Sequence, residues 1–209
     1  VDANWHGGEA PANPTTASVT FTTNNVPLAS TLDADRTIGT LVSGTHTVTA
    51  GGDSRTTLVD LNGRTLAVGT TLGSIAGNQY ARNTFILTNG TVQIGSDAKA
   101  ANLTVGAGAT LRFAPGTTLN ATNLGTLTVG VSGYIPSYLD LRGVRITGRD
   151  LKMKTLTLAI GSWRGAQVWL TPETQMDALT VTGATTMGSG GPGLGIYPIY
   201  IGNPGDTFS

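Results

Sequence analysis

Apolar and polar residues alternate over most of this chain, in short runs that Gly, Asn, Asp or Pro separate. Alternation places successive side chains on opposite faces of a strand, so one face meets a core and the other meets water. Sustained helical spacing is missing, and the best helical candidate, residues 97–101, is too short to be stable alone. The pattern therefore predicts an all-β protein made of many short strands.

Turn-forming residues bound these runs at short intervals. Such spacing is typical of a sandwich, a barrel or a β-solenoid. The predicted strands cover residues 18–23, 45–50, 56–61, 64–69, 84–88, 91–95, 102–105, 110–114, 126–130, 138–141, 144–147, 155–160, 166–170, 178–181 and 195–201.

One short motif, apolar–Thr–apolar–Gly, recurs along the chain with variations. It occurs at residues 101–106, 125–130 and 177–183, with looser copies at 64–69 and 154–158. In a solenoid the two apolar side chains stack on those of the next coil, the Thr faces outward, and the Gly occupies a corner. The motif predicts a right-handed parallel β-helix (β-solenoid), with a β-sandwich or jelly roll as the alternative.

The pattern predicts that the chain has three segments. Residues 18–187 carry the alternating pattern and are predicted to form the solenoid. Residues 1–17 carry no pattern and are predicted to be an extended arm or cap. Residues 188–209 are predicted to be a Gly-rich break and a C-terminal strand, which Pro198 confines to an edge or a cap.

The N-terminal sequence resembles a known group of surface proteins. Residues 5–8 (WHGG), 18–21 (SVTF), 30–41 (STLDADRTIGTL) and 58–68 resemble repeats of bacterial autotransporter-associated β-strand proteins, and the resemblance covers roughly residues 4–130. It implies a right-handed parallel β-helix, export, and roles in surface display, adhesion or fibre formation. It carries no catalytic residues.

Charge and cysteine content narrow the function classes. Charged residues make up 11% of the chain, and 12 basic side chains balance 12 acidic ones, so no basic surface for nucleic acid is expected. The chain has 30 Gly and no Cys, a composition that favours bacterial export. We therefore expect an extracellular or cell-surface protein without a membrane span.

Candidate catalytic and metal-binding residues are few. His6 and His46 are the only histidines, and without Cys they make a poor zinc site. Asp33 and Asp35 could form a carboxylate pair, but with Arg36 they are better interpreted as a turn in which Asp accepts backbone hydrogen bonds. We expect no enzymatic activity, no cofactor and no metal.

The densest charge cluster comprises Asp140, Arg142, Arg145, Arg149 and Asp150. Clusters of this kind serve polysaccharide cleavage in some β-helix enzymes. We instead expect Arg142 and Arg145 to decorate an outer face and pair with Asp140.

Two sets of residues are candidates for recognition. The expected subunit contacts are apolar residues near the two ends of the solenoid: Val19, Phe21, Ile196, Tyr197, Ile199, Tyr200 and Ile201. The expected surface-recognition residues are the clustered aromatics Tyr134, Tyr138, Trp163 and Trp169.

The predicted function is an extracellular structural or adhesive solenoid subunit that self-associates into a surface fibre or filament. The alternative is a carbohydrate-binding or polysaccharide-active β-helix module, including the phage tail-fibre type, with surface glycans as partner. A third possibility is that outward Thr ladders order water, as they do in some ice-binding proteins.

Overall fold

The computed structural model describes residues 16–21, 28–44, 54–75, 82–130, 136–158, 166–171, 173–187 and 200–202. Strands dominate these residues, and the one helical element among them is a 3-10 turn, η2 (Thr147–Arg149). No helix in the described part is long and apolar enough to cross a membrane. The predicted arm at residues 1–17 and the break that opens residues 188–209 fall almost entirely outside it.

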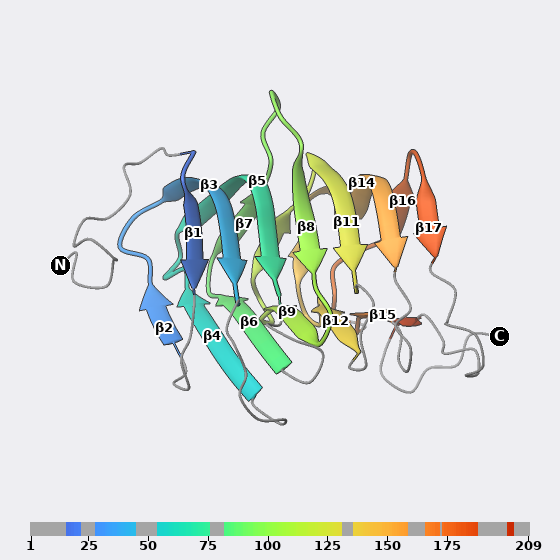
Figure 1. Ribbon diagram of the computed structural model, residues 1–209. Helices are drawn as coiled ribbons and strands as arrows, with labels where there is room; N and C mark the ends of the chain where they lie inside the picture. Colours follow the sequence, from blue (N-terminus) through green and yellow to red (C-terminus); the bar gives the residue numbers. More distant parts are fainter. Residues whose placement is uncertain are drawn as a thin grey trace.

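The strands form two sheets whose members stack along one axis (Figure 1). Sheet A, with 11 strands, contains β1 (Ser18–Phe21), β3 (Arg36–Ser43), β5 (Thr65–Ser74), β7 (Thr91–Ile94), β8 (Ala101–Val105), β10 (Thr118–Asn120), β11 (Leu124–Val129), β13 (Arg145–Ile146), β14 (Asp150–Leu158), β16 (Ala178–Val181) and β17 (Thr185–Met187). Sheet B, with 7 strands, contains β2 (Leu28–Thr31), β4 (Ser54–Asp60), β6 (Arg82–Thr88), β9 (Ala109–Phe113), β12 (Ser137–Asp140), β15 (Ala166–Trp169) and β18 (Tyr200–Gly202).

Each pair of named strands in these sheets is parallel. The chain passes from sheet A to sheet B and back, and each return adds one coil. This arrangement confirms the predicted parallel β-helix and excludes the sandwich and jelly-roll alternative, which are built from antiparallel sheets.

The core consists of inward side chains that stack from coil to coil. In sheet A the aligned residues are Leu41, Leu72, Leu103, Leu127 and Leu156, all at most 3% exposed. Sheet B contributes a facing column through Phe85, Leu111, Leu139 and Val168. Leu103 of the motif copy at 101–106 stacks on Leu127 of the copy at 125–130, as the motif predicts.

The recurring motif occupies two different positions in the coil. The copies at 101–106, 125–130 and 154–158 lie side by side, because β8, β11 and β14 are neighbours. The copies at 64–69 and 177–183 occupy a second position in sheet A, before the point where the coil reaches the first three copies. The copy at 64–69 pairs with β7, and β16 of the copy at 177–183 pairs with the first residues of β14. Both positions need apolar side chains that point into the core and polar ones that point to solvent, so the same sequence pattern suits both.

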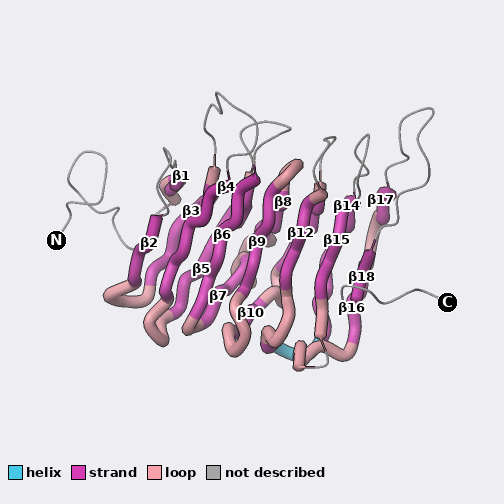
Figure 2. Tube along the Cα trace, turned by 90° about the horizontal axis from the view of Figure 1, so that it is seen from below, coloured by secondary structure: helices cyan, strands magenta, loops and turns pink. Residues whose placement is uncertain are grey.

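The turns along one side of the solenoid (Figure 2) each contain a residue with left-handed backbone conformation. Asn62, Asn89, Gly116 and Gly143 have φ values of 51°, 58°, 84° and 71°. Asn and Gly tolerate this conformation best. At Gly143 a Cβ would also lie 2.9 Å from the Pro115 side chain of the preceding coil.

A polar cluster replaces the apolar core near one end of β3, β4, β5 and β6. Ser43, Thr57, Ser74 and Asn83 are at most 2% exposed. The Asn83 amide donates to the Ser43 carbonyl oxygen at 2.8 Å and to Ser74 Oγ at 3.1 Å, and Ser43 Oγ donates to Thr57 Oγ1 at 2.8 Å. Buried polar groups are tolerated when they are paired in this way, and the pairs also fix the register of adjacent coils.

Several strands differ from the predicted ones. β2, β3, β10 and β17 lie where no strand was predicted, and β5 and β14 are longer than predicted. As expected, residues 97–101 form no helix: residues 97–98 form a turn, and Ala101 begins β8. The predicted strand at residues 45–50 lies outside the described residues.

Candidate functional site

The outer face of sheet B carries a cluster of polar and aromatic side chains on β12 and β15. Tyr138 and Asp140 point outward from β12, and they align with Gln167 and Trp169 on β15. The corresponding outward residues two and three coils before Asp140 are Ile86 and Leu58. The cluster is therefore a local departure from the apolar and Thr-rich outer face of the earlier coils.

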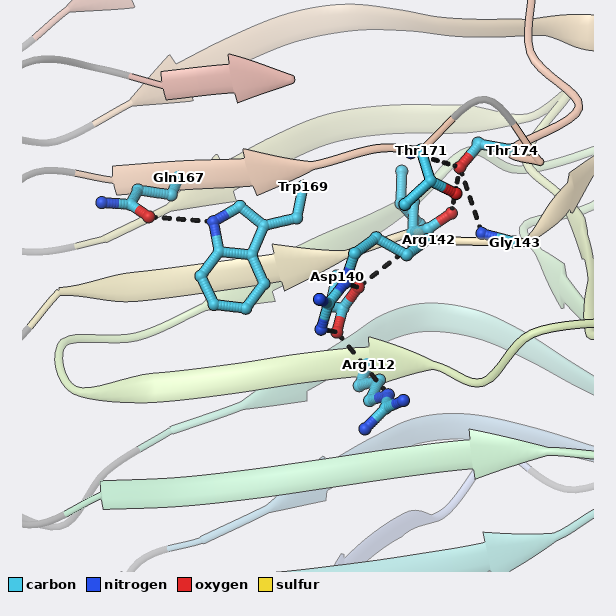
Figure 3. A network of polar contacts seen from close by, with 9 residues as sticks. Arg112, Asp140, Arg142, Gly143, Gln167, Trp169, Thr171 and Thr174 are labelled. Atoms are coloured by element: carbon cyan, nitrogen blue, oxygen red, sulfur yellow. Dashed lines mark hydrogen bonds and ion pairs between the residues drawn. The ribbon is translucent and has the colours of Figure 1, made fainter. Parts of the chain in front are cut away.

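Asp140 is the centre of this cluster, and its side chain is only 3% exposed (Figure 3). Arg142 donates to both of its carboxylate oxygens, from Nε at 2.8 Å and from Nη2 at 2.7 Å. Arg112 of β9 reaches the carboxylate with Nε at 3.6 Å. The two guanidinium groups compensate the buried carboxylate, and the hydrogen bond to Asp140 raises the pKa of Arg142 above its ordinary value.

Trp169 lies against the same arginine. The guanidinium carbon of Arg142 lies 4.7 Å from the indole centroid, and the Tyr138 ring lies 4.4 Å from it at a tilt of 49°. The indole Nε1 donates to Gln167 Oε1 at 2.9 Å. Cation–π and aromatic contacts of this kind hold the half-buried indole in one orientation.

A depression of about 360 Å³ adjoins this cluster, lined by Arg112, Pro115, Arg142, Gly143, Thr171 and Glu173. Buried Thr174 shapes its rim, because its hydroxyl donates to the Leu141 carbonyl and accepts from the Gly143 and Thr171 amides. A hydrogen bond from Thr171 lowers the pKa of Glu173, so Glu173 presents a carboxylate at neutral pH.

The aromatic prediction is tested only in part of the chain. The structure brings Tyr138 and Trp169 together, whereas Tyr134 and Trp163 lie outside the described residues. The predicted pairing of Arg142 with Asp140 is confirmed. Arg112 was not predicted, because its distance from Asp140 depends on the register between coils.

Arg145 and Arg149 do not join the Asp140 cluster. Arg145 lies on β13 in sheet A, where its neighbour in the preceding coil is Thr118. Arg149 pairs instead with Asp177 of the next coil, from Nε to Oδ2 at 2.6 Å. The predicted pairing of Arg145 with Asp140 is therefore wrong, because the two residues belong to different sheets.

The Arg149–Asp177 pair predicts a pH effect. The hydrogen bond from Arg149 lowers the pKa of Asp177 in the folded chain. Its stabilisation is therefore complete above the unfolded pKa of about 3.9 and disappears as pH falls through the lower folded value. We expect the Tm difference between the native chain and Asp177→Asn to be small at neutral pH, since the pair is exposed, and to vanish near pH 2. A Tm difference independent of pH would contradict this assignment.

The carboxylates of Asp33 and Asp35 each make hydrogen bonds with other residues. Asp33 accepts from Arg36 at 2.6 Å, and Asp35 Oδ1 accepts from the Thr65 backbone amide of the next coil at 2.8 Å. The predicted backbone hydrogen bond is confirmed for Asp35, whereas the bond to Asp33 comes from the side chain of Arg36 in the same coil. Among the described residues, no group of 3 or more His, Cys, Asp or Glu side chains could hold a metal ion; His6 and His46 lie outside them.

Outward Thr residues of sheet A form a partial ladder. Thr104, Thr128, Thr157 and Thr186 align on consecutive strands. The column continues through Gly73 and Val42 rather than Thr. This interruption removes the regular array on which ordered water would depend.

At each end of the described solenoid the strands pair on one side only. β1 and β2 at one end, and β16, β17 and β18 at the other, each pair with one described strand only. Their sequences are SVTF, LAST, ALTV, TTM and YIG, without a charged residue or Pro. Natural edges are usually protected by such residues, which these strands lack.

The predicted subunit contacts fall partly on these edges. Val19 and Phe21 lie on β1, where Phe21 is half-buried against Phe85. Tyr200 and Ile201 lie on β18, which pairs with β15 of the same chain. The remaining candidates, Ile196, Tyr197 and Ile199, lie outside the described residues.

Comparisons with protein-family models, curated proteins and solved structures gave no match.

Proposed function

We propose that this chain is a non-enzymatic, extracellular structural or adhesive subunit that stacks head to tail into a fibre at the bacterial cell surface. The uncharged strand edges at both ends carry this proposal, because such edges favour pairing with another chain. The resemblance of residues 4–130 to autotransporter-associated repeats supports the extracellular location.

The apolar columns support the same mode of association. Leu28 continues the sheet B core column at the first coil and is 37% exposed. At the last coil Leu179 and Val181 are only partly buried. A second copy stacked at either end would cover these side chains, and burial of apolar area stabilises association.

The register of sheet A defines which residues would meet. The column that begins at Thr20 on β1 ends at Thr186 on β17, and both residues are exposed. Continuing the sheet would place Thr186 of one copy beside Thr20 of the next, at the strand spacing of about 4.8 Å. Within one chain the two residues are roughly 30 Å apart, because six coil steps of that spacing separate them.

The double variant Thr20→Cys/Thr186→Cys tests this arrangement in a chain that has no other Cys. The expected spacing lies within the disulfide range of about 4.4–6.8 Å between Cα atoms. Mild oxidation should produce a ladder of covalent oligomers on a non-reducing gel, and a reductant should abolish it.

Two controls make the result specific. Thr20→Cys/Thr122→Cys places the second thiol on an exposed turn outside the column, and should give no ladder. Thr186→Lys adds an edge charge and should shorten the fibres seen by electron microscopy. Cross-linked species limited to dimers, together with isolated short rods across a dilution series, would refute head-to-tail stacking.

A further inference from the structure

The Asp140 cluster and its depression are not required by the solenoid fold. In the column of outward residues that contains Asp140, the preceding coils carry the uncharged residues Leu58 and Ile86. The next three residues of this column, Arg112, Asp140 and Trp169, are instead charged or aromatic. Burying a carboxylate stabilises a fold little compared with apolar packing, so this cluster calls for another explanation.

The cluster is pre-organised for a ligand. Asp140 fixes Arg142 through two hydrogen bonds and attracts Arg112, while Arg142 and Tyr138 fix the indole of Trp169. Side chains that are already ordered lose little conformational entropy on binding. Arg112 and Arg142 remain 40% and 34% exposed and line the depression.

The polar groups around the depression specify the ligand chemistry. Arg112 and Arg142 offer N–H donors, Glu173 offers a carboxylate acceptor, and the Thr171 hydroxyl, which donates to Glu173, can accept a further hydrogen bond. A complementary ligand needs adjacent groups that both accept and donate hydrogen bonds, and an apolar face for the neighbouring aromatic pair. Sugar hydroxyl groups and the C–H face of a pyranose ring combine these properties.

The charge and the size of the depression restrict the class of ligand further. Arg112 and Arg142 balance Asp140 and Glu173, so the site has no excess positive charge to attract a polyanion. Its volume of about 360 Å³ lies at the lower end of the ligand-site range of about 300–1,000 Å³. We propose that this depression, with Trp169 beside Arg142 at its rim, binds one or two units of a neutral saccharide.

The site goes beyond the proposed stacking and does not rest on it. β12 and β15 are internal strands of sheet B, each paired on both sides, so the lateral face remains available in a fibre. Saccharide binding and disulfide cross-linking through Thr20 and Thr186 therefore test separate surfaces.

The test uses the full chain on an array of short neutral oligosaccharides based on glucose, mannose, galactose and N-acetylglucosamine. Polygalacturonate and sulfated glycans form the charged arm. We expect binding to at least one neutral series, with affinity then measured by calorimetry. Trp169→Ala and Arg112→Ala should each weaken that affinity at least ~10-fold, the usual effect of removing a central contact residue.

Two matched controls separate recognition from folding. Arg145→Ala removes an exposed arginine from sheet A, and Ile86→Ala truncates the preceding residue of the same outward column. Both should leave the affinity unchanged. If Trp169→Ala does not fold, Arg112→Ala alone decides the result. Binding to no neutral series, binding to charged glycans only, or full affinity in a folded Arg112→Ala variant would overturn the proposal.

Discussion

Replacing Phe85 with alanine is expected to destabilise the protein by about 3–5 kcal/mol. The Phe85 side chain is 0% exposed and stacks on Leu111 of the next coil. Its ring also lies 6.1 Å from that of Phe21, at a tilt of 59°. Truncation removes apolar contacts on both sides and leaves a cavity that rigid neighbouring coils fill poorly.

Thermal and urea unfolding measure this loss. For a chain of this size the expected fall in Tm is about 10 °C. Thr84→Ala is the matched control, because Thr84 precedes Phe85 on β6 but faces outward; it should change stability by less than about 1 kcal/mol. Equal losses from both variants would show that the alternation along β6 does not define the core.

The second large effect is expected at Asp140. Asp140→Ala leaves Arg112 and Arg142 close together without their shared carboxylate, and breaking a buried pair in this way costs about 3–5 kcal/mol. Because Arg142 is 34% exposed and can be hydrated, we expect a smaller loss, about 2–3 kcal/mol.

A double-mutant cycle identifies the cause of that loss. Asp140→Ala/Arg142→Ala removes the guanidinium left without a partner, so the double variant should be more stable than the sum of the single effects predicts. Asp97→Ala serves as an exposed control, since Asp97 makes a single 3.2 Å hydrogen bond with Asn123. Strict additivity would mean that the Asp140–Arg142 contact contributes nothing to stability.

The sequence predicts the parts of this fold in which inward and outward residues alternate. Leu103 with Val105, and Leu127 with Val129, follow the apolar–Thr–apolar pattern, and they stack as expected. The start of β14 was not predicted, because two successive residues that are not buried, Lys154 and Thr155, interrupt the alternation between buried Met153 and buried Leu156. β2 has no buried alternate positions at all, since it lies at an open end.

The Asp140 site was harder to predict than the core. Tyr138 and Trp169 are evident as aromatics, but their contact requires the register of β12 on β15. Register cannot be counted from the sequence, because coils differ in length and irregularities interrupt pairing, as between Leu124 and Leu127. Arg112 joins the site through such a register, without any local sequence signal.

The parallel stacking of coils also determines how the protein carries mechanical load. Hydrogen bonds between parallel strands run along the solenoid axis, so a tensile force along that axis acts on successive coil interfaces in series. The seven-residue strand β4 pairs with β6 along its whole length, whereas β17 and β18 at the last coil have three residues each. The end coils are therefore held by short strands, since β1 and β2 pair over four residues each and β17 and β18 over three. We expect rupture under tension to begin at an end, where a stacked neighbour would add most to tensile strength.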